Sequence, residues 1–91
     1  MPTRLIPTIH VTSDFKKAFR RLPHHIQELA IKKDRLFRQD AFASFLRTHK
    51  LKGPLDGYYA YSVNLEYRIL FRFIKADEVI YYDIGTHEIY R

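Results

Sequence analysis

Three short segments of the sequence carry side chains that can transfer protons or bind phosphate. The first contains His49, followed by Lys50 and Lys52. An imidazole titrates near neutral pH, so it exchanges protons under physiological conditions. Neighbouring lysines favour its neutral form and can hold a phosphate beside it. His49 is therefore a candidate proton-transfer group, and a solvated loop histidine is the alternative interpretation.

The second segment contains Glu66 and Arg68. Residues two apart on a strand point to the same face, and we expect both to open a strand. A guanidinium offers a planar fork to a phosphate whose charge grows in a transition state. A carboxylate can accept a proton from a hydroxyl or orient a histidine. The alternative is a surface ion pair, which contributes about 0–1 kcal/mol.

The third segment is the last seven residues, 85–91, which include His87, Tyr90 and Arg91. His87 can protonate a leaving oxygen, Tyr90 can stack on a splayed base, and Arg91 can contact phosphate. Because the segment follows an expected strand, its side chains can return over the sheet. The alternative is a frayed chain end.

The basic residues are unevenly distributed. Between Lys16 and Lys52 the sequence has eleven basic residues and three acidic ones, whereas from Gly53 onward it has four basic and six acidic. A concentrated positive field favours a polyanionic partner, and phosphate contacts would make its binding salt-dependent. A helix face that only maintains solubility is the alternative. Arg47 and Arg72 join Lys50, Lys52 and Arg91 as candidate RNA-binding residues.

Length and composition exclude several classes of protein. A chain of 91 residues with 46% hydrophobic residues predicts one folded domain over residues 1–91. The absence of cysteine excludes disulfides and thiolate zinc sites. No spacing of metal ligands and no glycine-rich nucleotide motif is found, so no metal or cofactor is expected. No stretch is apolar enough to span a membrane, and the polar N-terminus predicts a cytoplasmic protein.

Two helices are predicted in the first half. Residues 5–11 are rich in β-branched side chains and predict a strand. Thr12, Ser13 and Asp14 then offer an N-cap, after which apolar residues recur at spacings of three and four. Pro23 separates this helix from a second one that continues to about Arg38. A short helical turn is expected near residues 42–46.

The second half alternates polar and apolar residues and predicts a three-stranded antiparallel meander over residues 58–64, 67–74 and 79–84. With the first strand this gives an α+β domain: an antiparallel sheet of about four strands, with the helix hairpin on one face, in the order β-α-α-β-β-β. The face expected under the helices carries Tyr59, Tyr61, Val63, Ile69, Phe71, Phe73, Ile80, Tyr82 and Ile84. The uncovered face is expected to carry Ser62, Glu66, Arg68, Arg72 and Tyr81, which suits RNA binding.

This arrangement resembles the RelE/ParE toxin superfamily, and it is most similar to the RelE and YafQ branches. The resemblance covers nearly the whole chain. It is carried by these residues in this order: Leu22-Pro23, His49-Lys50-Leu51-Lys52-Gly53, Gly57-Tyr58, Glu66-Tyr67-Arg68-Ile69 and Asp83-Ile84-Gly85-Thr86-His87.

Residue by residue, the resemblance implies a catalytic set. His49 matches the histidine that opens the His-x-Leu-x-Gly motif of the YafQ branch, and His87 matches its Gly-Thr-His. Arg68 matches a strand arginine of other RelE-like proteins, Tyr90 stands near a late aromatic residue, and Glu66 stands near an aspartate. Ser62 departs from the pattern, since the YafQ branch has a second histidine there.

The resemblance also implies an activity and partners. Such toxins cut mRNA, usually on the ribosome, and a cognate antitoxin protein blocks them. The implied reaction needs no metal, because the RNA 2′-OH attacks the adjacent 3′-phosphate. His49 or Glu66 takes the proton of that hydroxyl. Arg68 stabilises the charge that develops on the phosphate, and His87 protonates the leaving oxygen. Two alternatives are a ParE-like protein that inhibits DNA gyrase by binding, and an inactive homologue that only pairs with an antitoxin.

Overall fold

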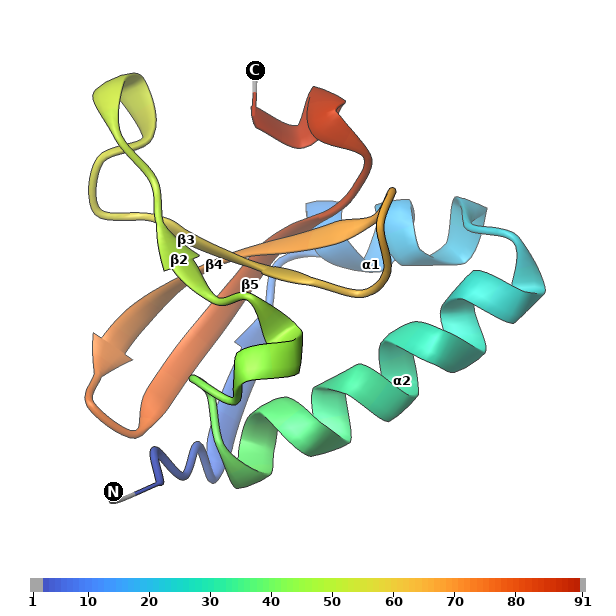
Figure 1. Cartoon of the computed structure of the whole chain (residues 1–91). Coiled ribbons are helices and arrows are strands. Elements are labelled where there is room, and N and C mark those ends of the chain that lie inside the picture. The colour runs from blue at the N-terminus through green and yellow to red at the C-terminus, as the bar shows by residue number, and fades with distance from the viewer. Residues whose placement is uncertain (1–2, 91) are drawn as a thin grey trace.

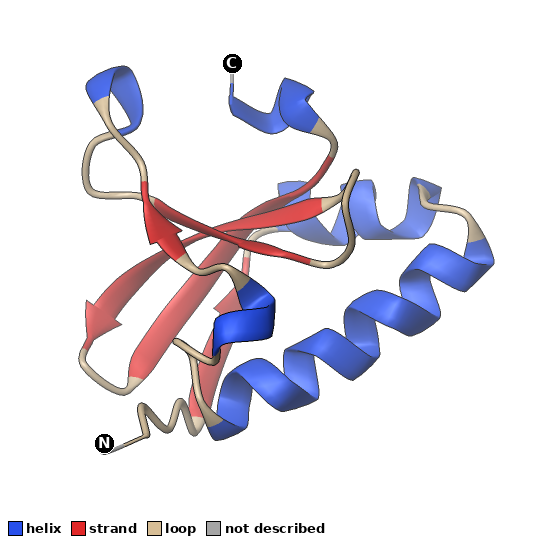
Figure 2. Cartoon of the chain, viewed as in Figure 1, coloured by secondary structure: helices blue, strands red, loops and turns tan. Residues whose placement is uncertain are grey.

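The structure is a computed structural model that describes residues 3–90. A β-sheet is covered on one face by two helices, and three 3₁₀ turns join the elements or end the chain (Figures 1 and 2). The elements in chain order are β1 (Thr8–Val11), α1 (Ser13–Arg21), α2 (His24–Gln39), η1 (Ser44–Leu46), β2 (His49–Lys50), η2 (Gly53–Leu55), β3 (Tyr59–Ser62), β4 (Arg68–Lys75), β5 (Glu78–Gly85) and η3 (His87–Tyr90). The predicted α+β class with a helix hairpin is confirmed.

The helix hairpin begins and turns where the sequence predicts. The hydroxyl of Thr12 accepts a hydrogen bond from the backbone N–H of Phe15 at 3.0 Å, which satisfies one free donor of α1. Pro23, which has no N–H to continue a helix, stands directly before α2. Ile26, Ala30 and Phe37 are buried from α2, so one stripe of this helix packs on the sheet. Neither helix is long and apolar enough to cross a membrane within the described residues.

The sheet has five strands in the order β1-β5-β4-β3-β2, one more strand than expected. The antiparallel meander of β3, β4 and β5 is confirmed. The extra strand β2 has two residues, too few to show an alternation in the sequence. β1 lies at the opposite edge and pairs with β5 in parallel, which corrects the expectation of a fully antiparallel sheet. The helix hairpin together with β2, β3 and β4 forms the long connection that a parallel pair needs.

An irregularity in β5 changes which side chains face the helices. Leu70 lies opposite Asp83 and Phe71 opposite Tyr81, which leaves Tyr82 as an extra residue. Such a bulge reverses the alternation beyond it. The expectation that Ile80 and Tyr82 are in the core is therefore wrong. The buried residues of β5 are instead Val79, Tyr81 and Ile84, and Tyr81 does not lie on the uncovered face as predicted.

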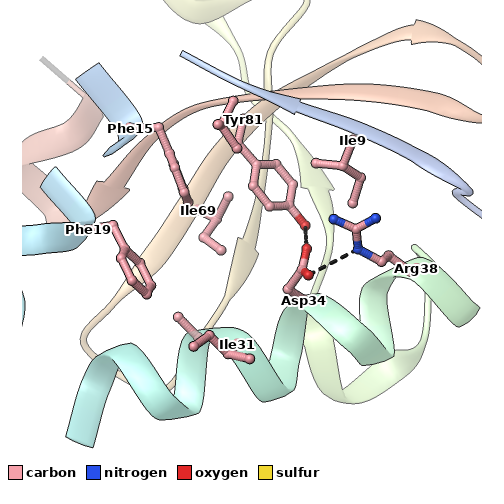
Figure 3. Close-up of a pocket in the computed structure, with 10 residues that line it drawn as sticks. Ile9, Phe15, Phe19, Ile31, Asp34, Arg38, Ile69 and Tyr81 are labelled. Carbon is pink, nitrogen blue, oxygen red and sulfur yellow. Dashed lines mark hydrogen bonds and ion pairs between the residues drawn. The ribbon is translucent and has the colours of Figure 1, made fainter. Parts of the chain in front are cut away.

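Tyr81 belongs to a polar chain that joins the sheet to α2 (Figure 3). The hydroxyls of Tyr61 and Tyr81 lie 2.9 Å apart, and the Tyr81 hydroxyl donates to Asp34 at 2.8 Å. The Nε of Arg38 donates to the same carboxylate at 3.0 Å. Burial raises the pKa of both tyrosines, so they stay protonated and can donate. These hydrogen bonds give the buried hydroxyls of Tyr61 and Tyr81 the partners that they need inside the core.

Candidate active site

The sheet face that α1 and α2 leave uncovered, here called the open face, carries three of the candidate side chains: His49, Arg68 and Arg72. Cross-strand partners point to the same side of a sheet. His49 is opposite Ala60, which is opposite Leu70; Ser62 is opposite Arg68, which is opposite Gly85. His49 and Arg68 are therefore on one face, two strands apart and offset by two residues along the strands, which separates their Cα atoms by about 12 Å. In Figures 1 and 2, η2 and η3 rise on the side away from α2.

The imidazole of His49 is held in a form suited to accepting a proton. Its Nδ1 lies 2.9 Å from the backbone carbonyl oxygen of Arg47. A carbonyl oxygen can only accept, so Nδ1 carries the hydrogen and Nε2 of the neutral ring has a free lone pair. The residue is exposed, so that nitrogen can reach a substrate.

The turn η3 lies on the same side of the sheet as Arg68. Gly85 pairs with Arg68, and a Cβ added to Gly85 would be 2.8 Å from Cγ2 of Ile89. Ile89 therefore covers the open-face side of Gly85. His87 and Tyr90 belong to this turn, and their ring centroids are 6.2 Å apart. The fold thus returns η3 over the sheet, on the side of Arg68.

The hydroxyl of Tyr90 is buried and has no hydrogen-bond partner among residues 3–90. Burial raises its pKa, and the positive charge of Arg68 partly opposes that increase. Tyr90 therefore remains protonated at neutral pH. A buried donor without a partner is unfavourable, so a hydroxyl that has no partner within residues 3–90 favours a ligand that has acceptor oxygens.

Gly85 gives a direct test of how η3 is positioned. Gly85→Ala is expected to displace η3, since the new methyl group would clash with Ile89. The amide resonances of His87 and Tyr90 should then shift in NMR spectra. The double variant Gly85→Ala with Ile89→Ala is the control, because it removes the Cγ2 atom with which the added methyl group would clash and should leave η3 in place. Unchanged resonances in η3 would contradict this account of the turn.

Glu66 is not placed as the sequence predicts. β4 begins at Arg68, so Glu66 lies in the preceding turn and the strand alternation does not apply to it. The side chain of Asn64 organises this turn by accepting from the backbone N–H groups of Glu66 at 2.9 Å and Tyr67 at 2.8 Å. Glu66 is exposed, and no ion pair joins it to Arg68 among the described residues.

The candidate RNA-binding cations separate into three groups. Arg72 lies on the open face, with its guanidinium 5.3 Å from the ring centroid of Tyr58. Lys50 pairs with Tyr59 and so points to the opposite face from His49. Arg47 and Lys52 are exposed in the segments that flank β2. Arg91 lies outside the described residues.

Sequence reasoning missed an aromatic pair on the open face. Tyr58 and Tyr82 contact each other at 5.2 Å between ring centroids, beside Arg72. Alternation with Ala60 already assigns Tyr58 to this face. Regular alternation assigns Tyr82 to the covered face, because it does not include the bulge in β5. Within residues 3–90, no group of three or more His, Asp or Glu side chains is arranged to hold a metal ion.

Comparison with solved structures identifies the fold. A YoeB/ParE toxin from Agrobacterium tumefaciens is 18% identical, with a TM-score of 0.72 over 88% of this chain and 98% of that one. The toxin–antitoxin complex RelBE2 from Mycobacterium tuberculosis contains a chain that is 16% identical, with a TM-score of 0.77 over 94% of this chain and 98% of that one. YafQ from Escherichia coli is 13% identical, with a TM-score of 0.66 over 90% and 94%.

Comparisons of sequence, by contrast, found no match. No protein-family model matches the chain, and no curated protein matches it. The chain therefore has the fold of the RelE/ParE toxins, as the resemblance predicted, and the likeness is carried by structure at identities below 20%.

Proposed function

We propose that this protein is the toxin of a type II toxin–antitoxin system and acts as an endoribonuclease on mRNA. The observation that carries the proposal is the arrangement on the open face: His49 with a free Nε2, Arg68 opposite Gly85, and a Tyr90 hydroxyl that has no partner within residues 3–90 and feels the charge of Arg68. The toxin fold supports the same conclusion. A protein that acts only by binding has no need of two exposed imidazoles on one face.

The proposed reaction is an intramolecular phosphoryl transfer. The RNA 2′-oxygen forms a bond to the adjacent phosphorus while its proton passes to Nε2 of His49. The bond from phosphorus to the 5′-oxygen breaks, and His87 gives that oxygen a proton. Arg68 and the Tyr90 hydroxyl stabilise the charge that develops on the phosphoryl oxygens. The products are a 2′,3′-cyclic phosphate and a 5′-hydroxyl, so DNA is not a substrate.

A cognate antitoxin is the proposed protein partner. Structures with this fold include the RelBE2 complex from M. tuberculosis and an archaeal RelE–RelB complex from Pyrococcus horikoshii. We place the activity in the cytoplasm, on message bound to the ribosome. The exposed basic residues of α1, namely Lys16, Lys17, Arg20 and Arg21, are suited to contacts with ribosomal RNA phosphates.

The experiment is in vitro translation of a reporter message with purified protein, followed by chemical analysis of the new RNA ends. We expect translation to stop and the message to end in 2′,3′-cyclic phosphate, with EDTA-treated purified RNA as the metal-free arm. A product with a 3′-hydroxyl would overturn the mechanism. Inhibition of gyrase supercoiling with intact message would instead favour the ParE-like alternative, and neither effect would favour an inactive homologue.

A further inference from the structure

A groove next to the candidate active site lies between α2, η1 and the turn from β3 to β4, and it shares only Arg68 with the proposed catalytic residues. Its volume is about 350 Å³, which is within the range of small-ligand sites. Its charged lining residues are Lys33, Arg47 and Arg68, and none of the acidic residues that the structure describes lines it. A groove with three cations and no carboxylate is complementary to an anion.

The groove also exposes apolar side chains. Phe45 is 52% exposed and Leu65 is 80% exposed, although both line the groove. The ammonium of Lys33 is 5.4 Å from the centroid of the Phe45 ring. That exposure remains after the Lys33 contact, so the ring keeps surface on which a flat molecule can stack. Cations next to an exposed aromatic ring form the combination that binds single-stranded nucleic acid.

Two groove residues connect it to the candidate active site. Arg68 lines the groove and also lies on the open face. Arg47 lines the groove, and its carbonyl oxygen holds Nδ1 of His49 at 2.9 Å. Arg47 adopts a left-handed conformation with φ of 52°, which residues other than glycine rarely adopt. A strand of RNA with its cleaved phosphate at Arg68 would therefore continue directly into the groove.

We propose that this groove binds the nucleotide next to the cleaved phosphate. Its base stacks on Phe45, and its own phosphate contacts Arg47 and Lys33. The proposal rests on the proposed function for the identity of the strand as message. An acidic protein segment would satisfy the charges, but the exposed ring and the continuity with Arg68 and His49 favour RNA.

The test measures binding of an all-2′-O-methyl hexanucleotide, which has no free 2′-OH to attack, by NMR titration and fluorescence anisotropy. Phe45→Ala should weaken binding about 5- to 150-fold, the range expected for loss of one stacked base. Phe45→Tyr keeps a ring and should bind as the wild type does. Phe42→Ala is the matched control, because Phe42 is 45% exposed and does not line the groove. Arg47→Ala should reduce the slope of log affinity against log salt by about one.

The outcomes separate this proposal from the proposed function. Equal affinity of Phe45→Ala and wild type, or no binding by a wild type that cleaves message, would overturn the groove while leaving the nuclease intact. Loss of oligonucleotide binding in Phe45→Ala, with a wild type that never cleaves RNA, would support the groove and overturn the nuclease. If Phe45→Ala lost affinity only for a co-expressed antitoxin, the groove would bind protein, and the proposal would be wrong.

Discussion

Arg68→Ala is expected to lower the rate of message cleavage by about 10²- to 10³-fold, the usual effect of removing one preorganised group that stabilises transition-state charge. Arg68 is opposite Ser62 and Gly85 on the open face, and its guanidinium donates to the carbonyl oxygen of Leu65 at 3.3 Å. The other N–H donors of the Arg68 guanidinium remain available to a phosphate. The measurement is single-turnover cleavage of a reporter message in a translation extract.

Two variants control for charge and for general RNA affinity. Arg68→Lys keeps the charge but loses the planar fork, so it should recover only part of the rate. Arg72→Ala removes a guanidinium from the same face, where Arg72 lies over Tyr58, and should cost less than tenfold. Arg68→Ala with wild-type cleavage and an unchanged melting temperature would remove Arg68 from the proposed mechanism.

His49→Gln is expected to lower cleavage by about 10²- to 10⁴-fold, the contribution typical of a general base. A glutamine side chain remains polar and is similar in length to histidine, but it cannot take up a proton from a hydroxyl. Glu66→Gln should keep nearly full activity, because Glu66 lies in the turn before β4 rather than on the open face. The opposite order of effects would make Glu66 the base.

The roles of the two imidazoles can be separated with a substrate whose leaving 5′-oxygen is replaced by sulfur. A thiolate leaves without a proton, so such a substrate should restore cleavage by His87→Gln. It should not restore cleavage by His49→Gln, which lacks the base. Restoration of both variants, or of neither, would contradict the assignment of His49 as base and His87 as acid.

The sequence predicts most of the secondary structure because local patterns encode it. Thr12 is a good N-cap, Pro23 interrupts a helical repeat, and the residues from Tyr59 onward alternate as a strand does. It cannot predict the bulge at Tyr82, because an extra residue leaves both halves of β5 with regular alternation. The parallel pairing of β1 with β5 is also hidden, since it joins segments far apart in the chain.

For the candidate site, the sequence by itself determined the chemistry: imidazoles at His49 and His87, and a guanidinium at Arg68. Their placement on one side of the sheet was decided by the tertiary structure, through the strand register and through Gly85, which leaves space for Ile89 and so lets η3 return over the sheet. The sequence likewise does not predict the groove at Phe45, because the residues that line it come from α2, η1 and the turn before β4. Residue types are local properties of a chain, whereas distances between side chains depend on the packing of segments that are remote in sequence.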